Sequence, residues 1–330
     1  MLKVAITGAG YISNIHARAL RSIDGVDLFG VVERYNKTAQ PFMAEYSIKN
    51  HYRTIFDLLE KAQIDALVIG TPNYLHAPQA IAALRAGLHV MVEKPMAMNA
   101  REAHRMLVAS QQSKALLMLA HCWRFDPEVK WLKEQLDSGR LGKVIRTKGY
   151  GVHERWGPSG WFTRKKLAGG GALADVGIHA LDTARYLLGD SLPESVYARI
   201  GTHYGNYDVD DTGVMVVNWH GGATSYIESG WWQPHAGGPN AATQVYAEKG
   251  FGQIFPTYIL EQDSITDPGF LYPRQNHAPQ SLYDEQMRYF VHCIQELTTP
   301  CPGGMEGWIN MKIIDAAYRS ARTGRVVECE

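Results

Sequence analysis

The sequence predicts an α/β fold in which a parallel, doubly wound sheet is followed by a mostly antiparallel sheet. Between residues 2 and 120, short apolar runs alternate with helical patterns, and this βαβα rhythm is typical of parallel sheets. Beyond residue 122, strand-like segments with alternating patterning dominate, which indicates a sheet with one covered face. A chain of 330 residues, at roughly 150 per domain, favours two domains, expected at 1–121 and 122–330.

In the first domain the apolar runs and the helical patterns follow one another in order. Strands are expected at 2–7, 27–33, 64–70, 88–92 and 116–120, and helices at 11–23, 36–46, 76–86 and 100–112. Short helix-to-strand links, such as the one at Gly87, suit such units.

The second domain is expected to open with a helix at 127–138, closed by Gly139. Its strands are expected at 144–153, 196–203, 213–220, 223–229 and 243–255, with hairpin glycines at Gly221-Gly222 and Gly250. Segments 237–239 and 261–280 are predicted to be loops, the latter because of its three prolines and weak periodicity. Two helices are expected to close the chain, at 281–297 and 307–322.

Composition narrows the function classes. Lysine plus arginine equals aspartate plus glutamate at 33 each, so no nucleic acid or membrane partner is expected. Apolar runs fall short of the ~20 residues a membrane span needs, and Met1-Leu2-Lys3-Val4 shows no signal-peptide pattern. The four cysteines form no C-x-x-C pair, so we expect no structural metal and a cytoplasmic protein with reduced thiols.

A glycine-rich turn, Gly8-Ala9-Gly10-Tyr11-Ile12-Ser13, follows the first predicted strand and opens a helix. It is a G-x-G-x-x-S version of the dinucleotide fingerprint, in which the first glycine permits a tight turn and the second admits pyrophosphate. The third position needs a small residue, and Ser13 is small. The short pattern by itself also suits an ordinary strand–turn–helix junction, but its place at the start of a βαβ unit favours a cofactor site that includes Gly8, Gly10, Tyr11 and Ile12.

Glu33 ends the second predicted strand, where a carboxylate can accept hydrogen bonds from a ribose 2′-OH and would repel a 2′-phosphate. NAD is therefore favoured. Arg34 leaves NADP open, because a guanidinium can stack on adenine or meet a phosphate. The alternative for Glu33 is an ordinary solvated charge at a strand end.

Thr71-Pro72-Asn73 follows another predicted strand, with His76 one turn later. Thr71 or Asn73 could hydrogen-bond the cofactor, and Pro72 fixes the loop. Asn73 would equally serve as the N-cap of the next helix, and His76 as a capping or packing residue.

Lys94, in Glu93-Lys94-Pro95, emerges at the carboxyl end of a predicted buried strand, the edge at which open α/β sheets bind ligands. In the second domain three glycines, 169–171, precede Asp175 and His179, which stand at i and i+4 and share a face if a helix begins after the glycines. An ordinary surface Asp–His pair is the alternative, and two such residues are too few for a zinc site.

Together these motifs resemble the glucose–fructose oxidoreductase / inositol dehydrogenase (Gfo/Idh/MocA) family over essentially the whole chain. Further matching segments are His16 after the glycine turn, Arg124-Phe125-Asp126-Pro127, the run 169–182 and the ending 315–326. The resemblance implies a Rossmann domain, then an α/β domain with a large open sheet through which members form homodimers or homotetramers. It also implies NAD(P)-dependent oxidation or reduction of carbohydrate or polyol carbons.

By position, the resemblance makes Lys94, Asp175 and His179 the catalytic residues, and it adds Glu93, Lys94 and Arg124 to the cofactor site. Trp161, Arg164 and Lys165 fall where some relatives approach the nicotinamide or substrate. Polar and aromatic residues that would suit a sugar are His153, Trp156, Trp161, Trp231, Trp232, His235 and Tyr283; His153 and Tyr283 are preferred with Trp161, although most aromatic residues in such a chain are core or interface residues.

The expected reaction is hydride transfer between nicotinamide and a hydroxyl-bearing carbon. His179 is the first choice as general base because an unperturbed imidazole titrates near ~6.5, whereas an unperturbed lysine near ~10.4 would need its pKa lowered. Lys94 would hydrogen-bond the same oxygen and could itself be the base. Asp175 would orient Lys94 or bind a substrate hydroxyl. Two alternatives stay open: an NAD-dependent glycosidase of the same superfamily, and a non-catalytic NAD-sensing regulator.

Overall fold

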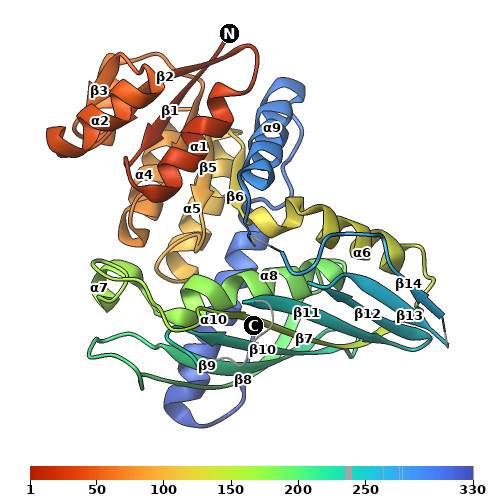
Figure 1. Cartoon of the computed structure of the whole chain (residues 1–330). Coiled ribbons are helices and arrows are strands. Elements are labelled where there is room, and N and C mark those ends of the chain that lie inside the picture. The colour runs from red at the N-terminus through yellow and green to blue at the C-terminus, as the bar shows by residue number, and fades with distance from the viewer. Residues whose placement is uncertain (235–239, 263, 275, 277, 330) are drawn as a thin grey trace. The chain divides into compact units, whose positions relative to one another are not determined.

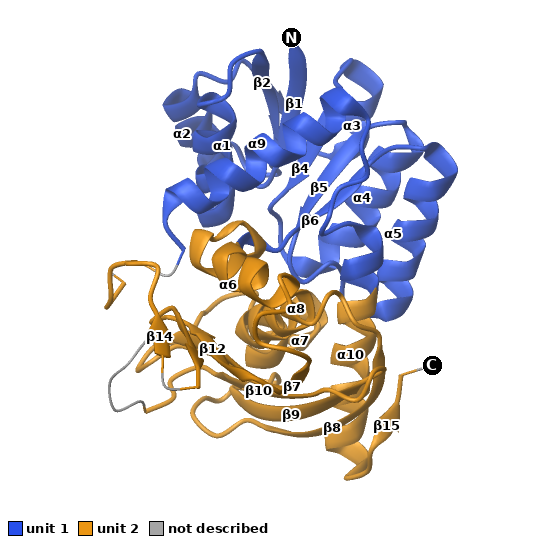
Figure 2. Cartoon of the chain, turned by 90° about the vertical axis from the view of Figure 1, so that its right-hand side faces the viewer, with its two compact units in different colours: residues 1–122, 278–308 blue, residues 123–277, 309–330 orange. Residues whose placement is uncertain are grey.

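The computed structural model describes residues 1–234, 240–262, 264–274, 276 and 278–329, and the chain divides into two compact units (Figures 1 and 2). Unit 1 comprises Met1–Cys122 and Ala278–Trp308, and unit 2 comprises Trp123–His277 and Ile309–Glu330. The chain first passes from unit 1 to unit 2 after Cys122, one residue beyond the domain boundary expected after residue 121. Residues 278–308, which the sequence boundary assigns to the second domain, pack with unit 1 instead.

The sheet of unit 1 is parallel and has the strand order β3-β2-β1-β4-β5-β6. Its central strands are largely apolar and buried, with β4 fully buried and β1 buried from Val4 to Thr7, as expected of strands covered on both faces. The order reverses between β1 and β4, which is the switch point at which such sheets bind ligands. The strands are β1 Leu2–Thr7, β2 Val26–Val32, β3 Asn50–Tyr52, β4 Ala66–Ile69, β5 His89–Glu93 and β6 Leu117–Ala120.

Helices cover both faces of this sheet, with α1, α2 and α9 on one side and α3, α4 and α5 on the other (Figure 2). They are α1 Tyr11–Arg21, α2 Asn36–Tyr46, α3 Ile55–Lys61, α4 His76–Arg85, α5 Ala100–Ser113 and α9 Gln280–Glu296, with a 3₁₀ turn at Asn73–Leu75. The late segment joins unit 1 because α9 packs on α1 and the Leu119 N–H donates to the carbonyl of Pro302 at 3.0 Å.

Two elements of unit 1 are absent from the sequence prediction, β3 and α3. The strand has three residues, too few for a period to show. The helix carries a local signal, because Thr54 and Asp57 form a capping box at its start. That signal lies in the sequence as Thr-x-x-Asp.

Unit 2 contains a nine-stranded sheet of order β14-β13-β12-β11-β7-β10-β9-β8-β15. β7 and β10 pair in parallel, and the remaining neighbours pair antiparallel, as expected of a mostly antiparallel sheet. The strands are β7 Val144–Val152, β8 Pro193–Gly201, β9 Thr212–Trp219, β10 Thr224–Gly230, β11 Ala241–Ala247, β12 Gly250–Ile254, β13 Tyr258–Glu261, β14 Ser264–Thr266 and β15 Val327–Glu328.

Several details of unit 2 differ from the prediction. The expected strand 243–255 is two antiparallel strands, β11 and β12. The turn that joins them lies just before Gly250, the expected hairpin glycine. The expected loop 261–280 contains β14, which pairs with β13 as a short outer hairpin, and prolines on both sides conceal that hairpin in the sequence. The expected loop 237–239 lies outside the described residues. Gly221 and Gly222 do form the β9–β10 hairpin turn, both with positive φ.

One face of the unit 2 sheet is covered by helices α6 and α8, whose ribbons lie against it in Figure 1. Gly151 in β7 lets the segment that leads into α8 approach the sheet closely, because a Cβ there would lie 2.7 Å from the carbonyl oxygen of Val176. The helices are α6 Pro127–Asp137, α7 Lys165–Ala168, α8 Ile178–Leu187 and α10 Gly304–Thr323, and a π-helical segment, Leu173–Gly177, leads into α8.

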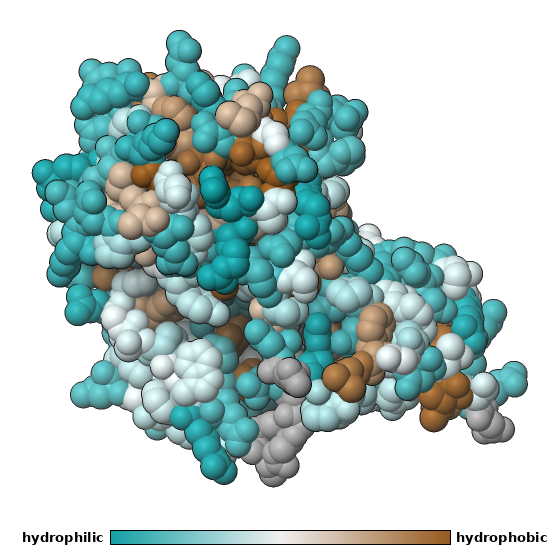
Figure 3. Space-filling model, turned by 45° about the horizontal axis from the view of Figure 1, so that its top comes forward, coloured by the Kyte–Doolittle hydropathy of each residue, from teal (hydrophilic) through white to brown (hydrophobic). Residues whose placement is uncertain are grey.

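Polar side chains predominate on the face of the molecule shown in Figure 3. Among the described residues, no helix combines the length and the apolar character that crossing a bilayer requires. The four cysteines are all free thiols.

Candidate active site

The glycine turn after β1 has the geometry that the dinucleotide fingerprint requires. Gly8 has φ +83°, and a Cβ there would lie 2.9 Å from the carbonyl oxygen of Gly70, at the end of the neighbouring strand β4. Ser13 is fully buried, and its hydroxyl lies 2.6 Å from where a Cβ on Gly70 would stand. The missing side chain of Gly70 therefore leaves the space that Ser13 occupies at the third position of the motif.

Gly10 is the N-cap of α1 and faces open space, with no atom within 4 Å of a Cβ built on it. The helix begins without a side-chain cap and without an acidic residue in its first turn. Backbone N–H groups at such a helix start, together with the helix dipole, suit a pyrophosphate. Tyr11 is exposed and Ile12 half-buried beside this opening. The residues present therefore fit a dinucleotide.

Glu33 directly follows β2, at the same edge of the sheet as the glycine turn. Its carboxylate accepts a hydrogen bond from the backbone N–H of Tyr35 at 3.0 Å, and its own backbone is tied to the edge strand β3 through Tyr52. Arg34 is exposed, with its guanidinium 5.6 Å from the ring centroid of Tyr35. The carboxylate thus has one backbone donor at the strand end, in an exposed setting, and its contact with a ribose stays a prediction.

The segment after β4 is braced from the sheet. Thr71 donates a hydrogen bond to Gln79 at 3.0 Å, and Thr7 at the end of β1 donates to the same oxygen at 2.9 Å. Asn73 is buried at the start of the 3₁₀ turn, while α4 takes Leu75 as its N-cap without a side-chain bond. The alternative of Asn73 as N-cap of that helix is therefore not the arrangement found.

His76 is buried between two backbone carbonyls, with Nδ1 2.9 Å from Pro95 O and Nε2 2.8 Å from Thr71 O. It thus links the loop after β4, which begins at Thr71-Pro72, to the loop after β5. Burial lowers the pKa of His76, although both carbonyls and Glu93 oppose that effect.

Lys94 follows β5 directly, and its backbone N–H donates to the carboxylate of Glu93 at 3.1 Å. The other oxygen of Glu93 lies 2.8 Å from Nε2 of His16 in α1, and both side chains are buried. Tyr283 of α9 meets the His16 ring edge-on at 5.9 Å, and burial raises the pKa of its hydroxyl. Glu93 thus contacts both His16 and the backbone of Lys94, and Tyr283 packs on His16; their roles toward cofactor and substrate stay predictions.

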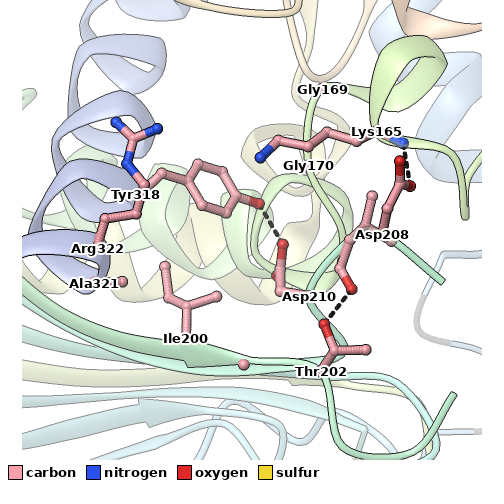
Figure 4. Close-up of a pocket in the computed structure, with 12 residues that line it drawn as sticks. Lys165, Gly169, Gly170, Ile200, Thr202, Asp208, Asp210, Tyr318, Ala321 and Arg322 are labelled. Carbon is pink, nitrogen blue, oxygen red and sulfur yellow. Dashed lines mark hydrogen bonds between the residues drawn. The ribbon is translucent and has the colours of Figure 1, made fainter. Parts of the chain in front are cut away.

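In unit 2 the three glycines form a tight turn around a buried carboxylate. Asp210 accepts hydrogen bonds from the backbone N–H groups of Gly171 and Leu173, each at 2.8 Å. It also accepts one from the Tyr318 hydroxyl at 2.7 Å, which Figure 4 shows. Burial raises the pKa of Asp210, although its three donors act in the opposite direction. A Cβ on Gly171 would lie 1.8 Å from the Asp210 carbonyl oxygen, so only glycine fits there.

A pocket of about 210 Å³ lies beside this turn (Figure 4). Lys165 and Asp208 line it, and the Lys165 backbone N–H donates to the Asp208 carboxylate at 2.7 Å. Arg164 is the N-cap of the short helix α7 that carries Lys165. The glycine turn is therefore preceded by a short helix tied to Asp208 and followed by a segment tied to Asp210.

Asp175 lies in the π-helical segment and His179 in the first turn of α8. A helical segment does begin after the glycines, but its first part is a π turn that leads into the α-helix, and π turns are frequent at functional sites. The Asp175 carboxylate accepts a hydrogen bond from the indole of Trp231 at 3.1 Å. The imidazole of His179 stacks on Trp123, with ring centroids 5.1 Å apart.

Arg124, predicted as a cofactor residue, is buried in unit 2 and forms paired hydrogen bonds to Asp182 and Asp190 at 2.7–3.1 Å. Burial disfavours its charge, but the two carboxylates outweigh burial and hold the pKa of Arg124 above its ordinary value. This network ties the segment after β6 to α8. A role toward the cofactor stays a prediction.

The aromatic residues expected to suit a sugar have different surroundings. His153, just past β7, stacks on Trp156 with centroids 3.7 Å apart, and Trp161 stacks on Phe162 at 3.8 Å. Trp156 and Trp232 are exposed, whereas Trp231 is only 1% exposed and therefore offers no stacking face. His235 lies outside the described residues.

Within unit 1, the parallel register brings the residue after β1, the loop after β4 and Lys94 to one sheet edge. Within unit 2, Asp175 and His179 lie on one short segment.

Sequence reasoning did not find Asp210, Tyr318 or the donor role of Trp231. Tyr318 lay inside the matched ending, but no local pattern links it to the glycines. Among the described residues, no group of three or more metal-binding side chains occurs.

Two family models match the chain. One, described as an oxidoreductase family with an NAD-binding Rossmann fold, matches residues 2–121, and the other, described as the GFO/IDH/MocA C-terminal domain, matches 129–251. D-glucoside 3-dehydrogenase of Escherichia coli (strain K12) is 29% identical over 99% of this chain and 97% of its own length. D-xylose 1-dehydrogenase (NADP(+)) 2 of Haloferax volcanii is 30% identical over 91% of each. Myo-inositol 2-dehydrogenase of Thermotoga maritima is 26% identical over 100% of this chain and 99% of its own length.

Solved structures agree on the fold. Aldose-aldose oxidoreductase from Caulobacter crescentus, complexed with glycerol, superposes with a TM-score of 0.86 and 27% identity over 99% of each chain. Levoglucosan dehydrogenase in complex with NADH superposes with a TM-score of 0.90 and 22% identity over 100% of this chain and 99% of its own. At 22% identity, the second likeness concerns the fold alone.

Proposed function

Because this chain belongs to the Gfo/Idh/MocA oxidoreductase family and carries its NAD-binding Rossmann domain, we propose that it oxidises or reduces a hydroxyl-bearing carbon of a sugar, inositol or related polyol. The observation that carries this proposal is the retained set of Lys94 at the end of β5 and Asp175 and His179 on the π/α8 segment. Relatives named as glucoside, xylose and inositol dehydrogenases support the substrate class.

For the cofactor, we propose NAD in preference to NADP. The open backbone at Gly10 accommodates pyrophosphate, and Glu33, held by the N–H of Tyr35, would accept hydrogen bonds from a ribose 2′-OH and repel a 2′-phosphate. Thr71, Pro72 and Asn73, beside the turn, would line the same site. The feature that favours NADP is Arg34, which is exposed and directly follows Glu33 in the sequence.

When bound, the nicotinamide supplies the hydride chemistry, and the protein supplies orientation and proton transfer. In the proposed division of labour His179 accepts the proton of the reacting hydroxyl, since imidazole ordinarily titrates near ~6.5. Lys94 donates a hydrogen bond to the same oxygen and stabilises its developing negative charge. Asp175 orients Lys94 or binds a neighbouring hydroxyl. His153 and Trp161 would contact the remaining part of the substrate.

We also propose that the protein is a cytoplasmic homodimer or homotetramer that assembles through the uncovered face of the unit 2 sheet. Alternate positions on β9 and β10 point away from the helices, and they include the half-buried Val216 and the exposed Tyr226. Apolar and aromatic residues on an uncovered sheet face suit an interface between copies.

The direct test is a screen for absorbance at the NADH band with NAD and NADP across inositols, aldoses, glycosides, sugar acids and amino sugars. We expect turnover with at least one of these classes, and a loss of about 10²–10⁴-fold in Lys94→Ala and in His179→Ala. Lys61→Ala and His220→Ala, at exposed positions, are the matched controls. Near-normal turnover in both active-site variants would refute the scheme. Release of free sugar without net NADH would instead favour the glycosidase.

A further inference from the structure

Trp231 and Asp175 are joined by a hydrogen bond within unit 2. The indole Nε1–H donates to Oδ2 of Asp175 at 3.1 Å across 56 positions of sequence. Trp231 follows β10 directly, and its side chain is 1% exposed, so it cannot present a face to a ligand. Its single polar atom is aimed at a carboxylate that the proposed reaction uses.

The indole is held firmly on its other sides. The backbone N–H of Trp231 donates to the carbonyl of Asp211 at 2.7 Å, and the ring meets Tyr207 edge-on at 6.2 Å. The Tyr207 hydroxyl donates to the Asp211 carboxylate at 3.0 Å, whereas the indole N–H goes to Asp175, so the hydroxyl takes no part in the indole bond. The apolar cluster around the indole is formed by Ala172, Val176, Val209, Phe162 and Tyr207. A tryptophan packed in this way has one orientation available.

We infer that Trp231 is a positioning residue for Asp175, an inference that rests on the proposed function of that carboxylate. An indole is a donor only, so it can neither give up its proton to the substrate nor accept one near neutral pH. What it can do is occupy one carboxylate oxygen and thereby fix the plane of the group. This matters at Asp175, because the carboxylate stands on a π turn, where a regular helical geometry does not set its direction.

The competing explanation is that Trp231 serves only to pack the core, and that its N–H bonds Asp175 because buried indoles generally have a hydrogen-bond partner. The two explanations differ in one measurable respect. A residue that acts through Asp175 loses its kinetic effect when Asp175 is removed, whereas a residue that acts through packing keeps it.

The kinetic experiment is a double-mutant cycle of Trp231→Phe and Asp175→Ala in the full chain, with saturating NAD and the substrate found in the screen. Phe keeps an aromatic ring and removes the N–H. We expect Trp231→Phe to lower kcat about 10- to 100-fold with the KM for NAD unchanged, and to lower it less than about 3-fold in the Asp175→Ala background. Tyr207→Phe, which alters the same cluster but leaves the indole bond, is the matched control and should retain kcat within about 3-fold.

A spectroscopic experiment tests the bond without turnover. In protein labelled with ¹⁵N at the indoles of its 8 tryptophans, the Trp231→Phe variant identifies the Trp231 signal. We expect that signal to move upfield and its proton to exchange faster in Asp175→Ala, and to stay in place in Tyr207→Phe. An unmoved signal in Asp175→Ala would overturn the inference.

Equal losses from Trp231→Phe in both backgrounds would also overturn it, and the proposed function would stand. If the wild type turns over no substrate at all, the proposed function fails, and the kinetic role of Trp231 fails with it. The two failures are therefore distinguishable from the wild-type screen alone.

Discussion

His16 and Glu93 form a buried pair in unit 1, with Nε2 and Oε1 2.8 Å apart, between the helix that follows the glycine turn and the strand that carries Lys94. The second oxygen of Glu93 accepts the backbone N–H of Lys94 at 3.1 Å. One carboxylate thus ties the cofactor helix to the residue expected to contact substrate. This relationship leads to the first prediction.

Glu93→Ala should leave the imidazole of His16 and the Lys94 N–H without their partner, and an unsatisfied buried polar group costs about 1–3 kcal/mol. We expect the free energy of unfolding, measured with urea, to fall by at least about 2 kcal/mol. Glu60→Ala, at an exposed position in unit 1, should change it by less than about 0.5 kcal/mol. Equal values for the two variants would show that the buried pair does not stabilise the fold.

His76 predicts a pH dependence of stability. Burial lowers its pKa in the folded state, so the unfolded chain binds the extra proton more readily. The contribution of the neutral His76 to the free energy of unfolding is therefore complete above the pKa of the unfolded chain, about 6.5. It is lost as the pH falls toward the lower pKa of the folded state. We expect the free energy of unfolding to decrease more between pH 7 and 5 in the wild type than in His76→Gln. His220→Gln, at an exposed histidine, should follow the wild-type curve, and a wild-type slope in His76→Gln would contradict the assignment.

Two glycines allow opposite predictions from the same substitution. In Gly171→Ala the new methyl group would lie 1.8 Å from a backbone oxygen, so the turn around Asp210 must distort. We expect a loss of about 3 kcal/mol or more in urea unfolding, because backbone cannot move aside as a flexible side chain can.

In Gly10→Ala the new methyl group meets no protein atom within 4 Å, and φ is −88°, so the fold should keep its stability within about 1 kcal/mol. The methyl group would instead enter the space proposed for pyrophosphate. We expect the Kd for NADH, followed by its fluorescence, to rise at least about 10-fold. Unchanged NADH affinity would remove the glycine turn from the cofactor site.

The parts of the fold that the sequence predicted are those set by local patterns. The alternating strands and helices of unit 1 follow from apolar periodicity, and the turn at Gly8 follows from residues that only a tight turn requires. By contrast, β14 escaped prediction because a three-residue edge strand among prolines has no period to read.

The supporting contacts of the candidate site escaped for a different reason. His16 and Glu93 stand 77 positions apart, Arg124 and Asp182 stand 58 apart, and Asp175 and Trp231 stand 56 apart. Residue types marked Lys94, Asp175 and His179 as chemically capable, but the partner that fixes a side chain depends on tertiary packing. For the same reason the sequence did not show that the buried Arg124 pairs with Asp182 and the half-buried Asp190 in unit 2, and its role toward the cofactor stays a prediction.

Glu33 carries the last prediction, on cofactor choice. Its carboxylate is held at the end of β2 by the Tyr35 N–H, and in the proposed site it would meet the 2′ position of the adenosine ribose. Glu33→Ser removes the negative charge and keeps a small polar side chain. We expect the ratio of kcat/KM for NAD to that for NADP to fall at least about 10-fold, because repulsion of the 2′-phosphate is lost while Arg34 remains. Glu45→Ser, at an exposed carboxylate on α2, should leave the ratio within about 2-fold. An unchanged ratio in Glu33→Ser would show that this carboxylate does not contact the ribose, and the preference for NAD would then need another source.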